Sequence, residues 1–129
     1  PIAIIDKRRP KANVSEVMNI IGDIKGKKCV IIDDIIDTAG TLAKAANVLK
    51  DMGALSVRAC ATHPVLSGPA YDRIAESALE EVIVSDTIPL STDPAKDKSK
   101  ITVLTMTDIF ASIIDKVYNY ESISPSFIN

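Results

Sequence analysis

Short apolar runs alternate with stretches of helical spacing along most of the chain. Six runs have the length of strands, and the run from Cys29 to Ile32 is apolar without a break, as in a strand covered on both faces. The predicted strands are Ile2–Ile5, Glu16–Ile24, Cys29–Ile32, Ser56–Thr62, Glu81–Asp86 and Ile101–Met106. A short helix fits Glu16–Ile24 nearly as well as a strand does, because that run is too short for its periodicity to decide.

Helical periodicity is clearest between Gly40 and Gly53. Apolar residues recur there at helical spacing and share one face, while Gly53 suits the C′ position just after a helix. The residues expected on the buried face are Leu42, Ala45, Ala46, Leu49 and Met52.

Two further segments predict helices. One covers Ser67–Ser77, with Pro69 in the first turn, and the other covers Asp108–Tyr120, with Thr107 or Asp108 as its N-cap. From Cys29 onward the order is strand, helix, strand, helix, strand, strand, helix. This alternation is typical of an α/β fold with a mainly parallel sheet flanked by helices.

Composition limits the class of protein. The 129 residues suffice for one domain, and a net charge of −2 gives no electrostatic argument for nucleic acid binding. No apolar run could span a bilayer and no targeting leader opens the chain, so we expect a cytoplasmic protein without a membrane partner. Cys29 and Cys60 lie in apolar segments, which predicts two buried free thiols rather than a disulfide.

The segment from Cys29 to Leu42 places carboxylates and small residues directly after a predicted strand. In open α/β sheets ligands bind at the carboxyl ends of strands, and the N-terminus of a helix offers unpaired N–H groups to an anion. Thr38, Ala39, Gly40 and Thr41 therefore predict a phosphate cradle, with small residues that admit the anion and hydroxyls that can donate to it.

The acids before this turn cannot bind the same phosphate, because like charges repel. Two adjacent carboxylates, Asp33 and Asp34, suit a vicinal diol or a hard cation such as Mg²⁺. A ligand with a phosphate and a nearby diol is a sugar phosphate, and a ribose 5-phosphate unit fits. The structural alternative is that these acids are strand-end polar residues while Asp37 or Thr38 caps the helix. The Walker A pattern is missing.

The segment "VIIDDIIDTAGTL" resembles the phosphoribosyl-binding motif of the type I phosphoribosyltransferase fold. With "AIIDKRRP", "VMNIIGDI", "ATHPVLSGPA", "SDTIPL" and "ESIS" in the same order, essentially the whole chain resembles the ribose-phosphate pyrophosphokinase (phosphoribosyl pyrophosphate synthetase) family. This resemblance implies Mg²⁺-dependent transfer of the β,γ-diphosphoryl group of ATP to the C1 hydroxyl of ribose 5-phosphate.

The resemblance also implies roles for individual residues. Lys7 and Arg9, on a flexible basic loop, stabilise the transition state, and Asp33 and Asp34 are also the implied Mg²⁺ ligands. The implied ribose 5-phosphate residues are Asp33, Asp34, Asp37, Thr38, Ala39, Gly40 and Thr41. Ala39 stands where family members often carry Gly.

Family chains are about twice as long, and this chain starts at Pro1 without an initiator Met. We therefore expect residues 1–129 to be one phosphoribosyltransferase-like domain, the C-terminal half of a two-domain enzyme, and to be inactive alone. The resemblance implies a homo-oligomer, a hexamer in the family, with ADP and phosphate as effectors. Ser122, Ser124 and Phe127 match the family's regulatory segment, although Pro125 and Ser126 replace its frequent Tyr-Leu pair.

Two alternatives remain at this point. A type I nucleobase phosphoribosyltransferase uses the same acidic motif but has no place for the "KRRP" loop, and a non-catalytic regulatory paralogue would not need the charged residues. His63, the single histidine, follows a predicted strand, where a local structural role is favoured over ligand contact.

Overall fold

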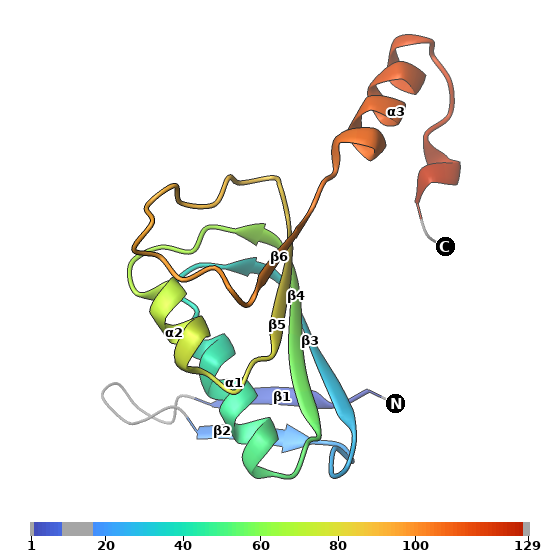
Figure 1. Ribbon diagram of the computed structural model, residues 1–129. Helices are drawn as coiled ribbons and strands as arrows, with labels where there is room; N and C mark the ends of the chain where they lie inside the picture. Colours follow the sequence, from blue (N-terminus) through green and yellow to red (C-terminus); the bar gives the residue numbers. More distant parts are fainter. Residues whose placement is uncertain (1, 9–16, 128–129) are drawn as a thin grey trace.

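The computed structural model describes residues 2–8 and 17–127 (Figure 1). Four parallel strands form the central sheet, and a separate antiparallel hairpin precedes it. The elements are β1 (Ile4–Arg8), β2 (Val17–Ile21), β3 (Lys28–Ile36), α1 (Gly40–Asp51), β4 (Ser56–Pro64), α2 (Ala70–Glu76), β5 (Glu81–Ser85), β6 (Ile101–Leu104), α3 (Thr107–Tyr118) and a 3₁₀ turn, η1 (Ser124–Ser126). The predicted α/β class and the predicted order of elements are both confirmed.

The sheet order β3-β4-β5-β6 follows the chain, and all three neighbouring pairs are parallel. Helices α1 and α2 make the first two crossovers, and both lie on the same face of the sheet (Figure 1). The third crossover, from β5 to β6, is a long loop without a helix. All four carboxyl ends therefore meet at one edge of the sheet, where α/β proteins bind ligands.

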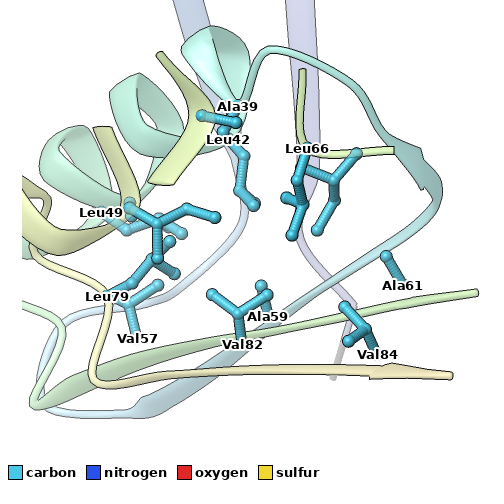
Figure 2. Close-up of a cluster of buried hydrophobic side chains, with 14 of the residues drawn as sticks. Ala39, Leu42, Leu49, Val57, Ala59, Ala61, Leu66, Leu79, Val82 and Val84 are labelled. Carbon is cyan, nitrogen blue, oxygen red and sulfur yellow. The ribbon is translucent and has the colours of Figure 1, made fainter. Parts of the chain in front are cut away.

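The core fills the space between the helices and this covered face (Figure 2). Alternate residues of β4 and β5 point into it, as a strand's two-residue period requires, and they are at most 4% exposed. They are Val57, Ala59, Ala61, Val82 and Val84. Alanines on β4 leave room for the helices to approach closely.

Helix α1 presents the predicted face to this core. Leu42, Ala45, Ala46 and Leu49 are buried, while Met52 is 44% exposed because the helix ends at Asp51. Gly53 has φ +94°, and its N–H donates to the carbonyl of Lys50, so the predicted C-terminal glycine is confirmed.

The other face of the sheet is open in the part of the chain that the structure describes. Val30 is 61% exposed and Ile32 is 82% exposed, so the prediction that this strand is covered on both faces is wrong for the described residues. Cys60 is exposed on the same open face, and Cys29 is half-buried. The predicted free thiols are confirmed, but their predicted burial is not.

Helix α3 projects beyond the end of the sheet (Figure 1), and none of its residues is buried. Met106, not Thr107 or Asp108, is its N-cap, without a side-chain cap, so that prediction was wrong. The N–H of Met106 instead donates to the Asp86 carboxylate at 2.9 Å. The hydrogen bond from the Thr105 side chain, followed by this one, lowers the pKa of Asp86. None of the described helices is long and apolar enough to cross a bilayer.

Lys100 stabilises the C-terminal end of α2. Its ammonium group donates to the carbonyls of Ala75 at 2.7 Å and Ser77 at 2.8 Å, where the helix dipole is negative. Lys100→Met should lower the free energy of unfolding by about 1–3 kcal/mol, because charge-assisted bonds are lost and carbonyls lose their partner. Urea unfolding measures this change. Lys25→Met, in an exposed turn, is the control, and equal stability of both variants would contradict the assigned role.

Candidate functional site

The site lies at the carboxyl edge of the sheet, where β3 leads into α1. Pairing with β4 extends β3 through both acids as far as Ile36, which is opposite Pro64. The prediction that the strand stops at Ile32 and the acids follow it was therefore wrong. Periodicity alone could not locate this end, because the hydrogen bonds of a neighbouring strand determine it.

Strict alternation would send the two adjacent acids to opposite faces, but alternation breaks in this part of β3. Ile32 is exposed while Ile36, an even number of residues further on, is buried in the core. Asp33 is in register with buried Ala61 and continues the partly buried series of Cys29 and Ile31 on the covered face. Asp34 is exposed, and its N–H donates to Oδ1 of Asp33 at 3.0 Å. Register therefore assigns Asp33 to the α1 side, whereas alternation does not assign Asp34 to a face.

A cavity of 960 Å³ lies between the hairpin, β3 and α1. Its walls are mainly apolar, but Asp33 from β3 and Thr41 from the first turn of α1 both line it. Two residues predicted to bind different parts of one ligand, the diol and the phosphate, therefore face the same space.

The turn between β3 and α1 has only three residues, Asp37 to Ala39. Ala39 adopts a left-handed conformation, with φ +56° and ψ +7°, and it is 4% exposed beside Leu42 in the core (Figure 2). No acceptor among the described residues pairs with the N–H groups of Thr38 and Ala39. With the unpaired N–H groups of the first helical turn, this geometry resembles the backbone nests that bind anions.

Asp37 joins this turn to the neighbouring loop. Its carboxylate accepts a short hydrogen bond from the Ser67 hydroxyl, and its carbonyl accepts from the Ser67 N–H at 3.0 Å. One bond from Ser67 leaves acceptor sites on the Asp37 carboxylate for the predicted contact with a ribose hydroxyl, above all on the other oxygen. Neither Asp37 nor Thr38 caps the helix through its side chain.

Arg73 of α2 is a residue of the site that the sequence did not reveal. Its Nη1 donates to the carbonyl of Thr38 at 3.0 Å. A Cβ atom on Gly40 would lie 3.1 Å from the same nitrogen. The residues are 35 positions apart, so only the packing of α2 beside α1 brings them together.

The metal prediction can be tested against the donors present. Within the described part of the chain, no group of three His, Cys, Asp or Glu side chains could hold a metal ion by itself. Mg²⁺ sites commonly use one or two carboxylates with waters and substrate phosphates, and the exposed carboxylates of Asp33 and Asp34 can take that part. The described residues therefore suit an Mg²⁺ ion whose remaining ligands are waters and substrate phosphates, rather than an ion held by protein side chains alone.

The remaining predicted residues lie away from the turn or outside the described residues. Lys7 lies on β1, in register with Met18, and Arg9 is outside the described residues. Nδ1 of His63 is 2.9 Å from the Thr87 hydroxyl, which agrees with a local structural role.

The predicted regulatory segment follows α3. Its backbone is held locally, since the N–H of Ser124 donates to the Ser122 hydroxyl and the N–H of Phe127 donates to the Ser124 carbonyl. The Phe127 ring is exposed. Figure 1 shows this segment beyond the end of the sheet, away from the start of α1.

A parallel sheet with carboxylates and a small-residue turn at its carboxyl edge defines an α/β domain whose ligand site lies at that edge. The chain matches the family model described as phosphoribosyl synthetase-associated domain over residues 3–128, and it belongs to that family.

Curated relatives are named ribose-phosphate pyrophosphokinase. The proteins from Campylobacter jejuni and Clostridium perfringens are each 57% identical over 127 residues, or 98% of this chain, which correspond to 40% and 39% of their lengths. The solved phosphoribosylpyrophosphate synthetase from Mycobacterium smegmatis superposes with a TM-score of 0.82 at 42% identity. That match covers 93% of this chain and 37% of that one, so this chain spans about 40% of its relatives' length.

The left-handed Ala39 gives a second prediction. Ala39→Gly removes the roughly 1–2 kcal/mol that this conformation costs a residue with a side chain. This gain is offset by the loss of about 0.8 kcal/mol of methyl burial and by the greater conformational entropy of the unfolded chain. The free energy of unfolding should therefore change by less than about 1 kcal/mol.

The matched variant is Ala39→Val. A β-branched side chain in this conformation and in a packed site should cost about 2 kcal/mol or more. Urea unfolding of both variants measures the contrast. A valine variant as stable as the wild type would show that Ala39 does not hold this conformation.

Proposed function

We propose that this chain contributes the ribose 5-phosphate site and a catalytic basic segment to a ribose-phosphate diphosphokinase. The complete enzyme transfers the β,γ-diphosphoryl group of ATP to the C1 hydroxyl of ribose 5-phosphate, giving phosphoribosyl pyrophosphate and AMP. The observation that carries the proposal is that Asp33 and Thr41 line one cavity beside the left-handed turn. Asp33 would accept from ribose hydroxyls there, and Thr41 connects the cavity to the turn whose N–H groups would bind the phosphate.

The proposed roles follow from the chemistry of each group. The N–H groups and hydroxyls from Thr38 to Thr41 hold the 5-phosphate, with Ala39 and Gly40 admitting it closely. Asp33, with Asp34 and the open oxygen of Asp37, accepts hydrogen bonds from the ribose hydroxyls. This arrangement fixes the orientation of the acceptor sugar and leaves C1 to face the donor.

Lys7 and Arg9 act on the transferred group in this proposal. Diphosphoryl transfer spreads negative charge over non-bridging oxygens, and positioned cations stabilise that charge more than they stabilise the ground state. Mg²⁺, shared by Asp33 or Asp34 with phosphate oxygens, would neutralise part of the same charge when bound.

Several finer proposals rest on family membership. The complete protein is a cytoplasmic homo-oligomer, and ADP and phosphate act on it through the segment containing Ser122, Ser124 and Phe127. The relatives' names support the substrates but say nothing of these features.

The chain of 129 residues should bind ribose 5-phosphate but form no phosphoribosyl pyrophosphate from it and ATP. Isothermal titration calorimetry measures binding, and detection of AMP measures turnover. Because Asp33 faces the cavity, Asp33→Asn should weaken binding roughly tenfold or more, as expected for a lost charge-assisted bond.

Asp34→Asn is the matched control for this prediction, and its effect should be the smaller of the two. A larger effect of Asp34→Asn would contradict the proposal that the sugar binds in the cavity that Asp33 lines. Turnover by the 129-residue chain would refute the claim that the donor site lies elsewhere.

In the complete gene product, Lys7→Ala should lower the rate of phosphoribosyl pyrophosphate formation by about two orders of magnitude or more while ribose 5-phosphate still binds. Steady-state kinetics and calorimetry measure the two quantities, and Lys25→Ala is the control. An unaltered rate would favour the non-catalytic paralogue or another mechanism. A nucleobase phosphoribosyltransferase would instead consume phosphoribosyl pyrophosphate with a base, and the same assays distinguish it.

A further inference from the structure

Arg73 contacts the proposed phosphate-binding turn at a backbone carbonyl, not at the N–H groups proposed to bind the phosphate. It lies in the last turn of α2, and its guanidinium crosses to the carbonyl of Thr38 at 3.0 Å. A guanidinium has five N–H donors, so one bond to this carbonyl leaves others for further partners. The side chain is exposed at this position and therefore lies at the open edge of the site rather than in the core.

The guanidinium of Arg73 also lies close to Gly40. Gly40 is not among the described glycines with positive φ, so its backbone conformation does not require glycine. A Cβ atom there would lie 3.1 Å from Nη1 and 3.7 Å from Cζ of Arg73, which is a tight contact. The absence of a side chain at position 40 therefore lets the guanidinium lie against the turn without a shift.

The bond to Thr38 acts on the peptide that carries the Ala39 N–H. Hydrogen bonds polarise one another, so a cation at the carbonyl end of a peptide makes its N–H a stronger donor. That N–H belongs to the turn proposed to hold the phosphate, and the nearby positive charge adds to the field of the α1 N-terminus. Arg73 can thus strengthen anion binding without touching the anion.

We propose that Arg73 is a positioning residue for phosphate binding, which holds the Thr38–Gly40 turn in its anion-binding conformation and polarises it. This inference rests on the proposed function, because it concerns the affinity of that same site for the 5-phosphate of its ligand. Arg73 sets affinity for the phosphorylated sugar and takes no part in the chemistry at C1.

The test is the kinetics of Arg73→Gln in the complete gene product. The KM for ribose 5-phosphate should rise roughly tenfold to a hundredfold, the range expected for one charge-assisted hydrogen bond, while kcat and the KM for ATP change less than threefold. Arg58→Gln, on the open face of the sheet near Glu81, is the matched control and should leave all three parameters unchanged.

Binding measurements on the 129-residue chain distinguish a failure of the role of Arg73 from a failure of the proposed function. Calorimetry with ribose 5-phosphate and with inorganic phosphate should show weaker binding of both to Arg73→Gln, and Arg73→Lys should recover part of it through the retained charge. Wild-type binding with no loss in Arg73→Gln overturns the role of Arg73 alone. Absence of ribose 5-phosphate binding to the wild type overturns the proposed function and this inference together. Parallel losses in the KM for ATP and in thermal stability would show a merely structural role and also overturn the proposal.

Discussion

The short connection between β3 and α1 is the constraint on which the site depends. Three residues must turn the chain from a nine-residue strand into a helix on the covered face, and this requires a left-handed Ala39. Hydrogen bonds from Leu66 to Ile36 and from Ser67 to Asp37 join this turn to the loop before α2. Leu66 is itself left-handed, with φ +48°, so two unfavourable conformations lie in adjoining loops. Such conformations persist where surrounding bonds determine them, and the result is a turn whose N–H groups are free for a ligand.

Local patterns predicted the parts of the fold that local forces determine. The α1 limits followed from helical periodicity and from Gly53, and the small residues before α1 indicated the turn that forms the candidate site. The end of β3 was missed, because pairing with β4 keeps the acids in the strand. Arg73 was missed for the same physical reason: its contact with Thr38 joins residues far apart in the sequence. The exposure of Ile32 could not be predicted either, since an uninterrupted apolar run does not reveal whether both faces of its strand are covered.

The cavity distinguishes the two adjacent acids of β3. Side by side in the sequence, Asp33 and Asp34 look like two arms of one clamp, yet of these two only Asp33 lines the cavity with Thr41. Alternation alone would not have separated them, because it breaks between exposed Ile32 and buried Ile36. In the proposed function, a sugar whose phosphate lies at the turn would therefore contact Asp33 first.

The position of the cavity also bears on the proposed acceptor and donor. The core lies on the covered face, and Asp33 and Thr41 line the cavity, so a sugar phosphate bound as proposed would have its contacts there. The described residues include no cluster that could hold a metal by itself, and the guanidinium of Arg73 contacts the turn at the carbonyl of Thr38. Transfer of a diphosphoryl group requires further cations around the phosphates of the donor. If diphosphoryl transfer is the function, the cations must come from Lys7, from Arg9, from a shared Mg²⁺ ion and from parts of the enzyme outside this chain. On that proposal, the described residues supply the sugar-phosphate side of the site, and other elements supply the positive charge that the transfer requires.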